Sequence, residues 1–246
     1  MSARVLALIP ELASWLVPLE RLEQQRKQDR EQRRASGIPA LDELLGGGWP
    51  RGALSEIAGP RSSGRTAVVL AALARALAAG EAAALVDAAG PGGALDPRAA
   101  VAAGIPLHEL LWIRCAPADA LKAVDLVVAA GGFGVVALDL CDGKCRVPDA
   151  AWIRLTHRAR EQGTSVLVVN GARRLGSFAT MAVELGQTRP SFLQDGPALF
   201  AEVRTRAALV RGGVRGAANQ TSQEHEHEHD DEGRPKCASL AFTCRS

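Results

Sequence analysis

The chain has 246 residues and a formal net charge of +2, and 47% of its residues are hydrophobic while only 4% are aromatic. This length and apolar fraction suit one α/β domain with an aliphatic core and extra terminal pieces. The nearly balanced charge excludes the strong overall positive field typical of many nucleic-acid-binding proteins. Five cysteines without C-x-x-C spacing indicate reduced thiols rather than a disulfide framework, so we expect a cytoplasmic protein.

The first 35 residues are expected to form a separate N-terminal helical segment. Apolar residues recur at helical spacing between Leu6 and Leu19. A charged run follows at 21–34, with opposite charges four residues apart. We expect this run to be a solvated helix face, with a contact to a partner or a phosphate as the alternative. The apolar stretch is interrupted by Glu11 and two prolines, so we expect neither a membrane span nor an export signal.

Residues 36–213 are expected to form the core, because short apolar runs alternate with longer helical ones. This alternation predicts an α/β fold with a mostly parallel central sheet and helices on both faces. Two later apolar runs, at 198–207 and 207–213, are expected to add antiparallel edge strands. The predicted strands are 53–58, 83–87, 111–114, 135–139 and 165–170, and the predicted helices are 66–79, 118–130 and 148–162.

Residues 214–246 form a polar tail without apolar periodicity, which predicts disorder. His225, His227 and His229 alternate with glutamates in this tail. Three imidazoles with carboxylates would bind a borderline metal weakly. Since no four-ligand spacing is present, a solvated tail is the preferred interpretation.

The stretch GPRSSGRT matches the phosphate-binding pattern G-x-x-x-x-G-K-[ST], except that Arg65 replaces lysine. It lies between a predicted strand and a predicted helix, where backbone N–H groups and the helix dipole would hold an anion. A strand-to-helix turn with a simple cap is the alternative. The candidate nucleotide-binding residues are Gly59, Pro60, Arg61, Ser62, Ser63, Gly64, Arg65 and Thr66, together with Asp139.

Arg65 changes what this loop is expected to do. Arginine keeps the positive charge but is a wide planar fork, so we do not expect it to take lysine's catalytic place against the β- and γ-phosphates. The Thr66 hydroxyl and the Asp139 carboxylate are the candidate Mg²⁺ ligands. A strand-end acidic residue that caps the next loop is the alternative for Asp139. The expected cofactor is therefore ATP with Mg²⁺, bound without hydrolysis.

Two stretches in this order resemble the beginning of the core of the RecA recombinases: SGIPALDELLGGGWPRGALSEIAGPRSSGRT and ALVDAAGPGGALDP. The resemblance covers about residues 36–212 and implies a RecA-like phosphate-loop core. The segments GGGWPRGALSE and PADALKAVDLVVAAGGFGVVALD are similar to the ImuA group, which are RecA-related accessory proteins of translesion synthesis.

The resemblance also implies that three catalytic positions are altered. Ala89 stands where the family has the glutamate that activates water, and Gly171 stands where it has a γ-phosphate sensor glutamine, although Asn170 is retained. Arg65 replaces the lysine. A general base contributes ~10²–10⁴-fold in rate, and charge-stabilising groups contribute further. We therefore expect a degenerate ATPase fold that has lost its turnover and acts as a binding protein.

The family holds single-stranded DNA in loops after the fourth and fifth core strands. The resemblance implies that the first loop is contracted to about 141–149, and that the second begins at 171. Arg173, Arg174 and Arg189 are available there for phosphates, with Phe178 and Phe192 as the nearby aromatic residues. Weak, salt-sensitive binding of single-stranded DNA is one hypothesis, and an ordinary solvated loop is the other.

The resemblance finally implies an accessory role in DNA repair, namely in the SOS response to DNA damage and in mutagenic translesion synthesis. The expected partners are RecA, the polymerase-like scaffold protein of the translesion mutasome and, indirectly, an error-prone DNA polymerase. A divergent ATPase and recombinase that depends on single-stranded DNA is the first alternative, with Asp96 replacing the missing base. A protein similar to bacterial division inhibitors is the second.

Overall fold

The computed structural model describes residues 32–88, 95–140, 147–192, 200–212 and 235–243. The chain divides into two units, Met1–Gln32 and Arg33–Ser246, and almost every described residue belongs to the second. Residues 1–31, which include most of the predicted N-terminal helical segment, lie outside the described residues.

Six parallel strands form the centre of the sheet, in the order β8-β3-β7-β6-β4-β5. Their residues are mostly buried aliphatic side chains, as expected for strands that are covered on both faces. The five core strands predicted from sequence are all present, and β8 is the addition. The strands are β3 (Ala53–Ala58), β4 (Ala82–Asp87), β5 (Leu110–Arg114), β6 (Phe133–Asp139), β7 (Ser165–Asn170) and β8 (Met181–Leu185).

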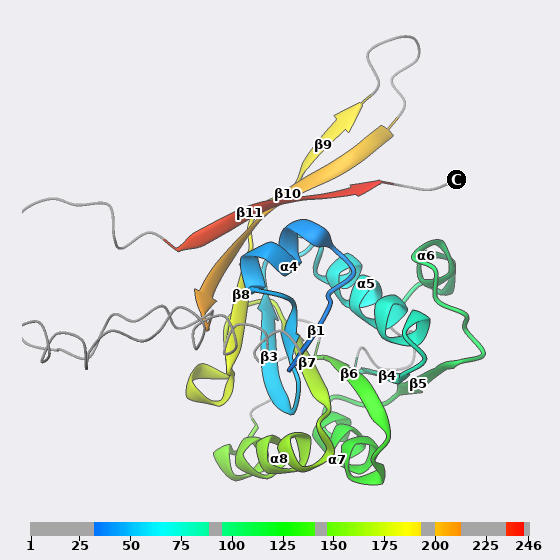
Figure 1. Cartoon of the computed structure of the whole chain (residues 1–246), viewed down its shortest axis with the longest axis vertical. Coiled ribbons are helices and arrows are strands. Elements are labelled where there is room, and N and C mark those ends of the chain that lie inside the picture. The colour runs from blue at the N-terminus through cyan, green and yellow to red at the C-terminus, as the bar shows by residue number, and fades with distance from the viewer. Residues whose placement is uncertain (1–31, 89–94, 141–146, 193–199, 213–234, 244–246) are drawn as a thin grey trace, which may run out of the picture. The chain divides into compact units, whose positions relative to one another are not determined.

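Helices cover both faces of this sheet (Figure 1). One buried cluster joins α4, α5 and α6 to the sheet, and a second joins α7 and α8 to the opposite face. The predicted α/β fold with a mostly parallel sheet is thus confirmed. The helices are α4 (Pro39–Leu45), α5 (Arg65–Ala78), α6 (Pro97–Ala102), α7 (Ala120–Ala130) and α8 (Asp149–Gln162), with a 3₁₀ turn η1 at Gly176–Phe178.

Three antiparallel strands extend the sheet beyond β8: β9 (Arg189–Phe192), β10 (Phe200–Arg211) and β11 (Lys236–Thr243). The two apolar runs predicted at 198–213 form the single strand β10. Their antiparallel direction is confirmed, but β10 lies between β8 and β11 and is not an edge strand.

Two predictions at the ends of the core are wrong in part. The tail predicted to be disordered contains β11, which pairs with β10 along its whole length, while residues 213–234 lie outside the described residues. The run at 21–34 was predicted to be helical, but its last two residues form β1 (Arg33–Arg34) and pair with β2 (Trp49–Pro50). Tertiary pairing overrides helix propensity at these two residues.

Candidate nucleotide site and basic ribbon

The carboxyl ends of four parallel strands meet at one edge of the sheet. Ala58 of β3 pairs with Asn170 of β7, and Asp87 of β4 pairs with Asp139 of β6. Because β7 separates β3 from β6, Asp139 lies two strands from the end of β3, or roughly 10 Å. This edge is where ligands bind in open parallel sheets.

The predicted phosphate loop leaves β3 at this edge and turns sharply. The Gly59 N–H donates to the Asn170 carbonyl oxygen at 3.2 Å, and the Ser63 N–H donates to the Pro60 carbonyl oxygen at 3.2 Å. Gly59 cannot carry a side chain, because its Cβ would lie 2.6 Å from Ser63 Oγ and 2.8 Å from the Leu185 carbonyl oxygen. Two residues of the loop are left-handed, Ser62 with φ 61° and Gly64 with φ 91°.

Helix α5 begins at Arg65, and no side chain caps its N-terminus. The first N–H groups of a helix have no partner within the helix, and its dipole favours negative charge at this end. The Ser63 hydroxyl is buried and makes no hydrogen bond within the described part of the chain. Uncapped donors and a buried, unsatisfied hydroxyl around one turn fit a phosphate group. Thr66, the candidate Mg²⁺ ligand, is exposed at the start of α5.

Phe242 of β11 lies directly over this loop, and it was not among the site residues predicted from sequence. A Cβ on Gly64 would lie 2.8 Å from Phe242 Cε2, so the ring packs against the bare glycine backbone. The same ring packs against the buried cluster that includes α5. The sequence did carry a signal, since Ala238, Leu240 and Phe242 alternate with residues of the opposite face.

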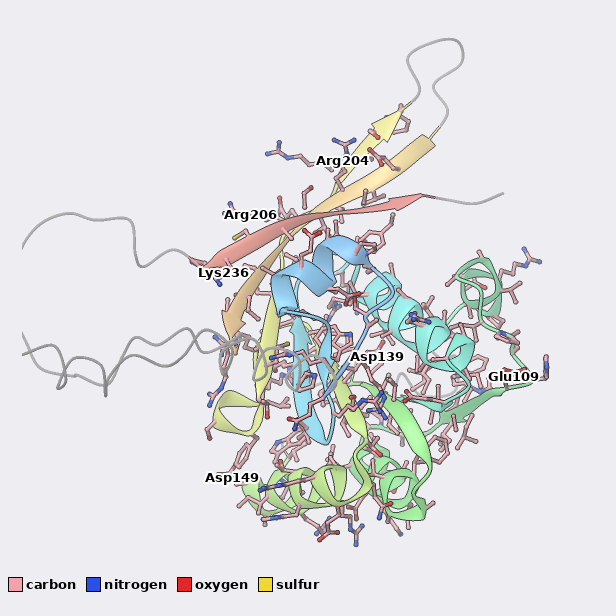
Figure 2. All side chains as sticks on the ribbon, in the orientation of Figure 1. Glu109, Asp139, Asp149, Arg204, Arg206 and Lys236 are labelled. Carbon is pink, nitrogen blue, oxygen red and sulfur yellow. The ribbon has the colours of Figure 1, made fainter. Side chains whose placement is uncertain are left out.

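Three acidic residues at the carboxyl edge of the sheet or beside it take part in hydrogen bonds with backbone N–H groups. Asp87 is 1% exposed, and its Oδ2 accepts the Leu95 N–H at 3.3 Å. Asp139, labelled in Figure 2, ends β6, and its carbonyl oxygen accepts the Ala88 N–H at 3.0 Å. Asp96 caps α6 by accepting the Arg98 N–H at 2.9 Å, so its carboxylate already serves a structural role. Ala89 lies outside the described residues.

Glu56 is a fully buried carboxylate in the middle of β3, and sequence reasoning missed it. Its Oε1 accepts the Asn170 Nδ2 group at 3.1 Å and the backbone N–H groups of Arg174 at 2.6 Å and Leu175 at 3.2 Å. Glu56 Oε2 and Asn170 Oδ1 are buried without partners among the described residues. Glu56 thus ties the loop after β7 to the strand that leads into the phosphate loop. The side-chain amide of Asn170 is turned onto Glu56, and Gly171 follows it.

The second predicted DNA loop is shorter than expected, because residues 181–185 form β8 instead of loop. Residues 171–180 remain, with Arg173 and Arg174 exposed. Arg189 lies on another element, as the first residue of β9. The three predicted DNA-binding arginines are therefore not on one loop. Phe178 packs against the core, whereas Phe192 is 52% exposed. The first predicted loop lies largely outside the described residues.

Arg189 instead belongs to a basic face of the antiparallel strands. It pairs directly with Arg204 of β10, and Arg206 follows two residues later on the same face. We call Arg189, Arg204 and Arg206 the basic ribbon; Figure 2 shows Arg204 and Arg206 along β10. Arg204 Nε donates a hydrogen bond to Glu202 Oε1 at 2.5 Å, and Arg206 Nη2 donates one to Cys237 Sγ at 3.2 Å. Sequence reasoning missed Arg204 and Arg206, because their shared face depends on the pairing of β9 with β10.

The described residues offer little support for a metal or redox site outside the loop. Cys115 and Cys237 are free thiols, and burial with the charges of Asp119 and Asp87 raises the pKa of Cys115. No group of three potential metal ligands occurs in the part of the chain that the structure describes, and the three tail histidines lie outside it. None of the described helices is long and apolar enough to cross a membrane.

Comparison with known proteins identifies the family. A model of the RecA N-terminal domain matches residues 18–151. The chain belongs to the RecA N-terminal domain family. This RecA-family chain is 40% identical to Protein RecA of Latilactobacillus sakei over 107 residues. The aligned region covers 43% of this chain and 29% of that protein. It is 43% identical to Protein RecA of Mycobacterium ulcerans over 106 residues, and that aligned region covers 42% of this chain and 30% of that protein.

The chain thus spans less than a third of the length of these RecA relatives. The crystal structure of the RadB recombinase matches with a TM-score of 0.57 and 21% identity, over 74% of this chain and 91% of that one. At this identity the likeness shows the fold alone. The predicted RecA-like superfamily is therefore confirmed, and the closer likeness to the ImuA group stays a prediction.

Proposed function

We propose that this RecA-family chain is an accessory protein of the SOS response and of error-prone translesion synthesis, which acts by binding partners and does not turn over ATP. One observation carries the proposal. The phosphate loop keeps its left-handed turn and uncapped helix, whereas the neighbouring end of β7 turns Asn170 onto Glu56 and continues with Gly171. The loop can hold phosphate, but Gly171 offers no side chain at the carboxyl edge of the sheet to contact the γ-phosphate. This combination supports nucleotide binding without hydrolysis.

In this proposal ATP with Mg²⁺ is a structural ligand. Backbone groups of residues 59–66 hold the phosphates, and Arg65 adds positive charge. Thr66 and Asp139 hold the metal ion, which neutralises phosphate charge when it is bound. Ala89 supplies no group that can accept a proton from water. The nucleotide would therefore be a ligand of the phosphate loop and not a substrate.

The proposed partners are RecA and the polymerase-like scaffold protein of the translesion mutasome, with an error-prone DNA polymerase bound indirectly, in the cytoplasm. Membership of the RecA family supports an interaction with RecA itself. The N-terminal segment, proposed as domain 1–35 before a core at 36–213, would provide an assembly contact to a neighbouring protomer.

Single-stranded DNA is a proposed weak ligand of the basic ribbon. Like charges placed directly opposite on neighbouring strands are destabilising, and Arg189 faces Arg204 in this way. Glu202 pairs with Arg204 and offsets part of this repulsion, and a phosphate backbone lying across the two strands would offset the rest. Arg173 and Arg174 remain a second candidate surface, on the loop anchored by Glu56.

The first experiment measures phosphate release by the purified protein with Mg-ATP and single-stranded DNA, with Arg65→Ala as the control. We expect no release above background from either protein. Turnover that DNA stimulates and Arg65→Ala abolishes would overturn the proposal and favour the ATPase alternative.

A second experiment measures the direct partner. The purified chain is added to RecA filaments, or to the scaffold protein, and sedimentation or pull-down measures complex formation. We expect the chain to bind at least one of them, with nucleotide present. If neither binds, and overexpression gives filamentous cells with an unchanged mutation frequency, the division-inhibitor alternative replaces the accessory role.

A further inference from the structure

A second polar site lies at the opposite end of α5 from the phosphate loop. A pocket of about 300 Å³ opens there, lined by Arg33, Arg34, Arg51 and Arg75 with Glu81 as the acidic member. Since α5 has 14 residues, its two ends are roughly 20 Å apart. The volume is at the small end of the range for ligand pockets. Four guanidinium groups and one carboxylate leave a clear excess of positive charge around a hollow.

Arg34 and Glu81 form the fixed wall of this pocket. Arg34 Nε donates to Glu81 Oε2 at 2.6 Å, and Arg34 Nη1 donates to the Gly163 carbonyl oxygen at 2.9 Å and to Ser165 Oγ at 3.0 Å. The Arg34 side chain is only 10% exposed. These hydrogen bonds and the burial of the side chain therefore hold the Arg34 guanidinium in one orientation, with no ligand required.

Glu81 does not cancel the charge of the remaining arginines. Its other oxygen accepts Arg51 Nη1 at 3.1 Å, so both carboxylate oxygens are engaged. Partial burial alone would raise the pKa of Glu81, but the hydrogen bonds and charges of Arg34 and Arg51 outweigh it and hold that pKa below its ordinary value of 4.5. Glu81 therefore stays ionised at neutral pH and orients two guanidinium groups beside the hollow.

Arg51 and Arg75 are the members that internal packing does not explain. The Arg51 side chain is 42% exposed, and its Nε and Nη2 groups have no hydrogen-bond partner in the described residues. The Arg75 side chain, exposed in the last turn of α5, makes no hydrogen bond or ion pair within the described residues. A cation in this turn offsets the negative end of the helix dipole, which would otherwise oppose an anion.

We infer that this arginine pocket binds a phosphoryl group, carried either by a nucleic-acid end or by a small phosphorylated molecule. Arginine forks suit the several oxygens of a phosphoryl group, and charge-assisted hydrogen bonds of this kind are roughly twice as strong as neutral ones. The fixed Arg34 and the exposed Arg51 and Arg75 surround the hollow from β1, from the β2–β3 turn and from α5. The inference is independent of the proposed function, because it uses neither the phosphate loop nor the basic ribbon.

The test is a calorimetric titration of the full chain with inorganic pyrophosphate at low salt. Arg51→Gln and Arg75→Gln should each weaken binding at the pocket by about tenfold, because each removes a charged donor. The double variant should weaken it by about a hundredfold. Arg98→Gln, an exposed arginine on α6, is the matched control and should change affinity less than about twofold. Arg65→Gln separates the phosphate loop from the pocket and should leave this binding unchanged.

Thermal melts check that the variants stay folded. We expect melting temperatures within about 4 °C of wild type, because Arg75 is exposed and Arg51 loses only a partly exposed ion pair with Glu81. Wild-type affinity in the double variant would overturn the inference, as would loss of all binding in Arg65→Gln alone. Equally tight binding of a glutamate-rich peptide would overturn the phosphoryl assignment and indicate an acidic protein partner. If a 5′-phosphorylated oligonucleotide binds more tightly than both its 5′-hydroxyl form and pyrophosphate, the ligand is a nucleic-acid end. If the 5′-phosphorylated oligonucleotide and pyrophosphate bind with equal affinity, the ligand is a small phosphorylated molecule.

Discussion

Glu56 is a fully buried carboxylate on which three donors depend: the Asn170 side chain and the N–H groups of Arg174 and Leu175. We predict that Glu56→Ala lowers the free energy of unfolding by about 3 kcal/mol or more, because it strands these buried donors. Glu56→Gln keeps an oxygen acceptor and replaces an oxygen that has no partner. It should therefore stay within about 1 kcal/mol of wild type. Urea unfolding measures both, and equal losses would contradict the assigned role of Oε1.

The Glu81 carboxylate makes stability depend on pH. Its pKa is lower in the folded chain than the ordinary value of 4.5, so it stabilises the fold above that pH. This contribution is lost as pH falls through the lower folded pKa. We predict that Glu81→Gln is less stable than wild type by about 1 kcal/mol at pH 7, the size of a partly exposed ion pair. The two unfolding free energies should converge in acid.

The matched control for this pH dependence is Glu161→Gln, at an exposed position near the end of α8. It removes one negative charge without breaking an ion pair in the described residues. Its stability curve should run parallel to that of wild type. A constant difference between Glu81→Gln and wild type down to pH 3 would show that packing, and not ionisation, explains the loss.

At the scale of elements, β11 contributes to the site, since Phe242 packs against Gly64. Leu240 lies on the same face and is 0% exposed, while neighbouring Ser239 is exposed. We predict that Leu240→Ala lowers the free energy of unfolding by about 3 kcal/mol, whereas Ser239→Ala changes it by less than about 0.5 kcal/mol. Chemical denaturation measures both variants. Equal, small effects would mean that β11 does not pack on the core.

The sequence predicted most of the elements that position the site, and the misses have physical reasons. Strands β3 and β7 have the predicted bounds: β7 is apolar from Val166 to Val169, and β3 begins and ends with apolar residues, while every residue of both strands is buried. Helices α4 and α6 were missed because they are only 7 and 6 residues long, too short for a helical period to be seen. Strand β8 was assigned to a loop because the family resemblance suggested one there. Strand β11 was hidden by the polar composition before it.

The site residues that could not be predicted from the sequence depend on contacts between distant segments of the chain. Glu56 accepts hydrogen bonds from residues more than 110 positions away, and Phe242 reaches Gly64 across most of the chain. Neither meeting follows from local periodicity, because it depends on strand order. The phosphate loop could be predicted because its residues are consecutive.

For the whole molecule, the family model matches only part of the residues on which the proposals rest. The match ends at residue 151, and the basic ribbon lies beyond it. A net charge of +2 also hides the ribbon, because acidic residues elsewhere balance its arginines. The proposed DNA binding would therefore depend on local charge density, and its dependence on salt is the property to measure.

We predict that binding of single-stranded oligo(dT) weakens with salt, and that replacing Arg189, Arg204 and Arg206 together by glutamine reduces the slope of log K against log [salt] by about 2. Each phosphate contact on a single strand contributes about 0.7 to this slope. Fluorescence anisotropy between 50 and 200 mM salt, roughly the range where such contacts are lost, measures the slope. The matched control replaces Arg173 and Arg174, which lie on the loop that Glu56 anchors. If the slope instead falls by about 1.4 in that control and is unchanged in the ribbon variant, the loop after β7 holds the DNA. Unchanged slopes in both would exclude either surface, leaving protein partners as the ligands of this chain.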